Sequence, residues 1–117
     1  MHHPVLGSGV KERALVSPMS LVRKFFENSK IDLVLAGHFH QSKIGLFSTV
    51  GNSGRSVVVS QAPSICSTRL KGEPNGFHLI SLSQDAVGIE LWRWHGERFT
   101  PETANAFQRS ENGWESA

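Results

Sequence analysis

An amphipathic stretch followed at once by a short apolar run limits the architectures open to this 117-residue chain. Ser17-Pro18 is a helix-start signal, and apolar residues then recur at helical spacing over residues 18–28. Residues 31–36 are mostly apolar and end at Gly37, a pattern typical of a strand covered on both faces in a parallel sheet. A helix that leads into such a strand is half of an α/β repeat, so we expect an α/β fold.

The rest of the chain has the pattern of short strands separated by turns. Strand-like runs cover residues 44–50, 57–61, 76–83 and 87–95. With residues 31–36, they predict one helix and about five strands. Residues 100–117 are polar with few apolar anchors, so we expect a loosely ordered tail after a domain at 1–99. Trp92 and Trp94 share one strand face and either pack against the core or a neighbouring layer, or offer a stacking platform for a nucleobase.

Composition excludes several classes of protein. The net charge of +2 is too small for a protein specialised for duplex nucleic acid or a membrane surface. The apolar runs are too short for a transmembrane helix, and the absence of a signal-peptide pattern favours the cytoplasm. Residues 1–60 hold seven basic and three acidic side chains, which favours contact of an anionic substrate with this half. Cys66 is the only cysteine, so no internal disulfide forms, and we expect it to be a small apolar filler.

The histidines form two groups. Residues 2–4 are His-His-Pro, and residues 37–40 are Gly-His-Phe-His, directly after the best predicted strand. In extended backbone, His38 and His40 would point to the same side, at the strand end where α/β sheets place their sites. Neutral imidazole binds Zn, Mn and Fe. On spacing alone, the pair is also explained by surface or hydrogen-bonded side chains.

Three further polar residues have alternative interpretations. His78 and His95 lie in or at the end of predicted strands with no ligand-type neighbour, so we interpret both as structural. Arg69 lies in a loop with several hydroxyl side chains, and its guanidinium could hold a phosphate in two-point contact. Alternatively, Arg69 caps a turn or pairs with Glu73.

These motifs resemble the C-terminal half of a calcineurin-like metallophosphoesterase. The late motifs of that family are a strand ending in His-x-Pro or His-His-Pro and a strand ending in Gly-His-x-His, matched here by residues 2–4 and 32–40. Residues 67–80, Ser-Thr-Arg-Leu-Lys-Gly-Glu-Pro-Asn-Gly-Phe-His-Leu-Ile, are similar to bacterial members of the cyclic-nucleotide phosphodiesterase branch. The resemblance covers residues 2–99. It implies the C-terminal portion of a two-sheet αββα sandwich.

The resemblance also implies a dinuclear metal site. His2 and His38 would bind one metal ion and His40 the other. His3 is not a family ligand at its position and either lines the substrate pocket or packs. In the family, two divalent ions (Mn, Fe or Zn) bridged by hydroxide hydrolyse phosphate monoesters or diesters, cyclic nucleotides among them. Such chemistry needs no protein nucleophile, and the sequence shows no Ser/His/Asp or Cys/His constellation.

The earlier metal-binding motifs of the family do not occur in this sequence. Asp-x-His, Gly-Asp-x-x-Asp with its metal-bridging Asp, and Gly-Asn-His are all missing. We therefore expect a truncated product or a gene model opened at an internal methionine, with weak metal binding and little or no hydrolysis on its own. Unpaired sheet edges would then favour self-association. The alternative is a non-catalytic domain that binds a metal ion or a partner protein.

Overall fold

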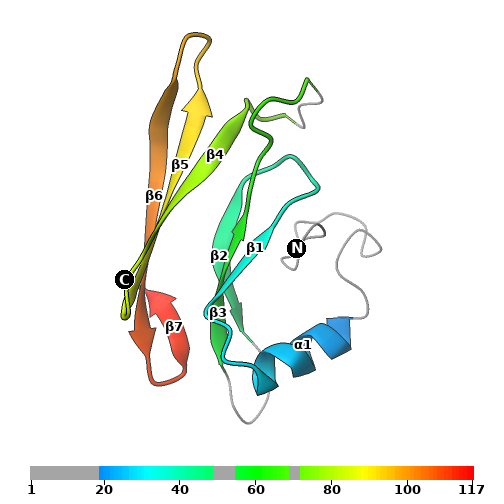
Figure 1. The fold of residues 1–117 in the computed structure, drawn as a ribbon, viewed down its shortest axis with the longest axis vertical. Helices are drawn as coiled ribbons and strands as arrows, with labels where there is room; N and C mark the ends of the chain where they lie inside the picture. The colour runs from blue at the N-terminus through cyan, green and yellow to red at the C-terminus, as the bar shows by residue number, and fades with distance from the viewer. Residues whose placement is uncertain (1–18, 49–54, 69–71) are drawn as a thin grey trace.

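The computed structural model describes residues 19–48, 55–68 and 72–117. In chain order the elements are α1 (Met19–Asn28), β1 (Leu33–Ala36), β2 (Lys43–Ser48), β3 (Ser56–Gln61), β4 (Gly76–Leu82), β5 (Ala86–Trp94), β6 (Phe99–Ser110) and β7 (Gly113–Ser116) (Figure 1). The predicted helix and all five predicted strands are present. Within the described residues, α1 is the one α-helix and has ten residues. No helix in this part of the chain is long and apolar enough to cross a lipid bilayer.

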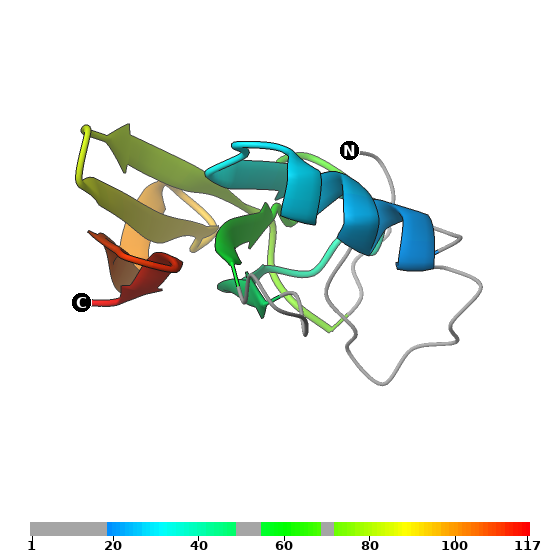
Figure 2. The same cartoon turned by 90° about the horizontal axis from the view of Figure 1, so that it is seen from below.

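The strands form two sheets. Sheet A has the order β1-β3-β2, and sheet B has the order β4-β5-β6-β7. α1 lies against one face of sheet A and sheet B lies on its other side, so the described residues form three layers (Figures 1 and 2). The predicted α/β class is confirmed in this form, with two sheets, mostly strands and one short helix.

Strand β3 is the centre of both hydrophobic cores. All six of its residues are buried, and Val57, Val58 and Val59 have no exposed surface. Side chains alternate between the faces of a strand, so its valines point to α1 and to sheet B in turn. The core on the α1 side contains Phe26, Val34, Phe47, Val57 and Val59, and the core between the sheets contains Val58, Val87, Ile89, Phe107 and Trp114.

Strand β1 pairs with β3 in parallel, with Leu33 opposite Val58. The predicted parallel pairing is confirmed, but the expected cover on both faces holds only in part: Val34 packs in one core and Leu33 against the other, whereas Leu35 is left uncovered. Among the described strands, β1 has β3 as its one neighbour, and the Leu35 side chain is 53% exposed. A short apolar run does not distinguish a central strand from a marginal one, and here the central strand is the Val-Val-Val run of β3.

The expected loose tail at residues 100–117 is instead two strands of sheet B. β6 pairs with β5 along nearly its whole length, and β7 pairs with β6. Most side chains of β6 are exposed, which explains its polar sequence, because backbone pairing alone holds that part of the strand. Phe107 and Trp114 are buried and anchor the hairpin in the core. The described residues therefore contain seven strands rather than about five.

Trp92 and Trp94 lie on the outer face of sheet B, not in the core. The buried positions of β5 alternate with them and are Val87, Ile89, Leu91 and Arg93. The Trp92 ring stacks on Phe77 with centroids 5.9 Å apart, and Trp94 contacts Phe99 at 5.2 Å. The aromatic pairs thus pack against one another across neighbouring strands.

The turn between β6 and β7 joins the two sheets. The backbone N–H of Ser56 at the start of β3 donates to the Asn112 carbonyl at 2.8 Å, and the N–H of Trp114 donates to Ser56 Oγ at 2.7 Å. Gly113 between them has a φ of 104°. A Cβ there would collide with the Ser56 carbonyl oxygen and lie 2.9 Å from the Ser56 nitrogen, so only glycine allows this approach.

Replacing Gly113 with alanine should therefore destabilise the fold by about 3 kcal/mol or more, because backbone strain and a backbone collision add together. Gly96→Ala is the matched control, since Gly96 also has a positive φ (88°) but open space around its Cβ position. That variant should lose only about 1 kcal/mol. Urea unfolding of both variants measures the difference. Equal losses would show that the Gly113–Ser56 approach is not tight.

Candidate functional site

His38 and His40 lie in the connection between β1 and β2, residues 37–42, which we call the histidine loop. β1 and β3 are parallel, so their carboxyl ends share one end of sheet A, and the histidine loop begins there. The predicted position of the pair, just past the carboxyl end of a strand, is confirmed. His2, His3 and Arg69 lie outside the described residues, so their proximity to this pair stays a prediction.

The backbone of the histidine loop differs from the extended form that we expected. His38 has a φ of 90° and His40 a φ of 56°. Both values lie in the left-handed region, so the same-side argument for an extended i, i+2 pair does not apply. The His38 ring is exposed and lies 5.5 Å from the Phe39 ring, while His40 is half-buried. Two such residues cost of order 1 kcal/mol each, so surrounding contacts must hold this conformation.

Contacts from three segments hold the end of the histidine loop. The Gln61 side-chain amide donates to the Gln41 carbonyl at 3.1 Å. The backbone N–H of Ser42 donates to Glu73 Oε2 at 2.9 Å, and Ser42 Oγ lies 2.7 Å from His78 Nε2. Gln61 ends β3, whereas Glu73 and His78 belong to the segment before β4 and to β4 itself. Both sheets therefore contribute to the support of the loop.

His78 bridges the two sheets through both ring nitrogens. Its Nδ1 lies 2.6 Å from Ser60 Oγ on β3, opposite the contact of its Nε2 with Ser42. Burial of the ring, the largest cause, and the nearby charge of Arg93 together lower the pKa of His78 from 6.5 to about 4, and the charge of Glu73 partly opposes this shift. The ring is therefore neutral at neutral pH, with one nitrogen donating and the other accepting. Its interpretation as a structural histidine agrees with these contacts.

Arg93 is a buried charge next to this bridge. Its side chain is 7% exposed and donates to Glu73 Oε2 at 2.7 Å, to Glu102 Oε2 at 3.2 Å and to the Pro74 carbonyl at 3.0 Å. The same Glu73 oxygen that accepts from Ser42 thus also accepts from Arg93. Charge-assisted hydrogen bonds of this kind are the stronger ones, so Glu73 is firmly placed.

Asp32 belongs to a second polar cluster, away from the histidine loop. Its carboxylate accepts from Arg55 at 3.2 Å, from Arg109 at 3.1 Å and from the Trp114 indole N–H at 3.0 Å. The hydrogen bond from Arg109 is the main cause that lowers the pKa of Asp32, and burial partly opposes it. Asp32 therefore ties the start of β1 to β6 and β7. Cys66, expected as an apolar filler, is exposed.

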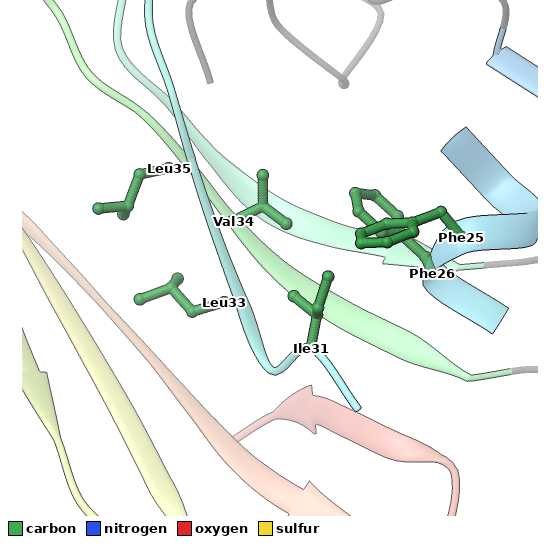
Figure 3. Close-up of a pocket in the computed structure, with 6 residues that line it drawn as sticks. All are labelled: Phe25, Phe26, Ile31, Leu33, Val34 and Leu35. Atoms are coloured by element: carbon green, nitrogen blue, oxygen red, sulfur yellow. The ribbon is translucent and has the colours of Figure 1, made fainter. Parts of the chain in front are cut away.

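No complete metal cluster occurs within the described ranges. In residues 19–48, 55–68 and 72–117, no three His, Cys, Asp or Glu side chains gather closely enough to hold a metal ion. An apolar hollow of about 380 Å³ lies between α1 and β1, lined by Phe25, Phe26, Ile31, Leu33, Val34 and Leu35 (Figure 3). Of the described residues, neither His38 nor His40 lines this hollow, and the side chains that do line it are all apolar.

Sequence reasoning missed the polar residues that support the histidine loop. One signal was present at Arg93, which continues the two-residue period of the apolar positions 87, 89 and 91 in β5. A buried charge on an inward face needs a partner of opposite charge, and Arg93 has Glu73. The contact of Ser42 with Glu73 spans 31 residues, and no local pattern encodes it.

Comparison with models of known protein families, with curated protein sequences and with solved structures finds no match to this chain. The resemblance to the metallophosphoesterases therefore rests on the motifs quoted from the sequence.

The neutral state of His78 predicts that acid destabilises the fold. The unfolded chain takes up a proton near pH 6.5, whereas folded His78 does so only near pH 4. This contribution to the free energy of unfolding is fully present above pH 6.5 and is lost as the pH falls towards 4. The expected loss is roughly 2 kcal/mol, which is less than the full pKa difference corresponds to, because solvent partly screens the ring. Urea unfolding between about pH 7.5 and 5 measures this slope, above the range in which carboxylates such as Asp32 take up protons.

His78→Asn should flatten the slope, because the asparagine amide does not titrate. His95→Asn, which removes an exposed histidine at the end of β5, serves as the control and should keep it. An unchanged slope in His78→Asn would show that another group causes the acid sensitivity.

Proposed function

We propose that this chain is the C-terminal portion of a cytoplasmic calcineurin-like metallophosphoesterase, an enzyme that hydrolyses phosphate esters with two divalent metal ions. The observation that carries the proposal is the Gly-His-Phe-His motif at the carboxyl end of β1, a strand that pairs in parallel within a layered α/β fold. The His-His-Pro motif at residues 2–4 and the similarity of residues 67–80 to the phosphodiesterase branch add support. The latter favours phosphodiesters, including cyclic nucleotides, as substrates.

The donor atoms of the histidine loop suit the proposed metals. His38 and His40 present imidazoles, which are good ligands for Mn, Fe and Zn, and with His2 they would hold the two ions. When bound, two divalent cations supply Lewis acidity towards the phosphoryl oxygens. The residues of this chain would bind and orient these ions, and Arg69 and His3 are proposed to contact the substrate.

In this proposal the sequence supplies only part of the metal ligands that a dinuclear site needs. Three imidazoles without a bridging carboxylate leave each ion with one or two protein ligands, whereas catalytic zinc sites have about three. Neutral donors also leave the charge of two cations uncompensated. We therefore propose weak metal binding and little hydrolysis by the 117-residue chain alone.

Metal binding by this chain should depend on the histidine loop. We expect the 117-residue chain to bind Mn²⁺ weakly, and His38→Ala and His40→Ala each to weaken binding by about tenfold or more. His95→Ala removes an exposed histidine outside the loop and should leave the affinity unchanged. The EPR signal of free Mn²⁺ measures binding in each titration. Equal affinities in all four proteins would contradict a metal site at the loop.

Catalysis is tested by restoring the missing motifs. We expect the reading frame ahead of Met1 to continue into Asp-x-His and Gly-Asp-x-x-Asp sequences. The longer chain should hydrolyse bis-p-nitrophenyl phosphate with Mn²⁺, and His38→Ala should lower that rate at least about a hundredfold. The 117-residue chain should show almost none. A frame without these motifs, together with a metal-independent or absent activity, would overturn the proposal.

A further inference from the structure

The histidine loop must cross the end of a strand that lies between the two strands it joins. β1 and β2 flank β3 in sheet A, so residues 37–42 pass over the carboxyl end of β3. The chain that leaves β3 stays beside the loop start, because the Ala62 N–H donates to the Ala36 carbonyl at 2.8 Å. With two left-handed residues in this short span, the conformation is not one that the loop sequence favours by itself.

Ser42 is the residue at which this loop is fastened. Both its backbone nitrogen and its hydroxyl are engaged, the first by Glu73 at 2.9 Å and the second by His78 at 2.7 Å. Each partner is itself held in place, Glu73 by buried Arg93 and His78 by buried Ser60. Arg93 belongs to sheet B and Ser60 to sheet A, so Ser42 is fixed with respect to both sheets.

We propose that Ser42 is a positioning residue, which sets the orientation of His38 and His40 through its contacts with Glu73 and His78. The inference rests on the proposed function where it says that the oriented histidines bind metal. The effect of Ser42 on the conformation of the loop does not depend on that function. Outer partners that orient metal ligands commonly change metal affinity by about 10- to 100-fold. Ser42 is not one of the expected metal ligands, so in this proposal it acts through the loop.

The serines on either side of His78 provide a matched pair of variants. Ser42→Ala and Ser60→Ala each delete one hydroxyl bonded to the same imidazole, but only Ser42 belongs to the histidine loop. Ser42→Thr restores a hydroxyl at the same position. A purely structural role of the His78 bridge predicts the same result for both alanine variants, whereas a positioning role predicts a larger response of the loop in Ser42→Ala, because Ser60→Ala leaves the contacts of Ser42 in place.

Hydrogen–deuterium exchange of the amides of residues 38–41 tests the proposal in the 117-residue chain without metal, with the β3 amides as an internal reference for folding. We expect exchange of the loop amides to become about tenfold faster in Ser42→Ala relative to β3, to stay near the original rate in Ser42→Thr, and to change clearly less in Ser60→Ala than in Ser42→Ala. Mn²⁺ titration by EPR should show about tenfold weaker binding in Ser42→Ala and a smaller change in Ser60→Ala.

The outcomes separate the two proposals. Faster loop exchange in Ser42→Ala without Mn²⁺ binding in any protein would support the positioning role and overturn the metal site. Unchanged loop exchange in Ser42→Ala, or equal changes in Ser42→Ala and Ser60→Ala, would overturn the positioning role even where Mn²⁺ binds at His38 and His40.

Discussion

Burial of β3 on both faces is the constraint on which the other layers depend. Val57 and Val59 pack under α1, while Val58 between them packs against sheet B. A strand whose successive side chains enter two different cores fixes the distance between the helix and the second sheet. Slipping this strand by one residue would exchange the two faces, so both cores select the same register.

The same strand changes character along its length. The valines of its first half are followed by Ser60 and Gln61, which are also buried but polar. Buried polar groups need partners, and the Ser60 hydroxyl has His78 while the Gln61 amide nitrogen has the carbonyl of Gln41. The apolar half of β3 thus joins the layers, and the polar half links them to the histidine loop. The candidate site lies where the hydrophobic contact between the sheets gives way to hydrogen bonds.

The sequence predicted the elements with local periodicity and missed those held by distant contacts. The spacing in α1 and the apolar runs of β1 and β3 are visible in short windows. β6 is polar on most of its length, because pairing with β5 rather than burial stabilises it, so composition alone suggested a tail. The Asn112-Gly113 pair was an available hairpin signal for β7. The loop that contains the left-handed residues His38 and His40 ends at Ser42, and the partners of Ser42 are Glu73 and His78, which lie 31 and 36 residues further along the chain.

Buried Arg93 positions the residues that hold the histidine loop, at a cost in desolvation. Moving a guanidinium out of water costs several kcal/mol, and pairing it with carboxylates offsets only part of that cost. Replacing a buried ion pair with well-packed apolar residues of similar volume is often neutral or stabilising. The charge of Arg93 fixes the position of Glu73 Oε2, and the same oxygen accepts a hydrogen bond from the backbone N–H of Ser42. Arg93 thus contributes to the placement of the histidine loop through the Glu73 oxygen that it shares with Ser42.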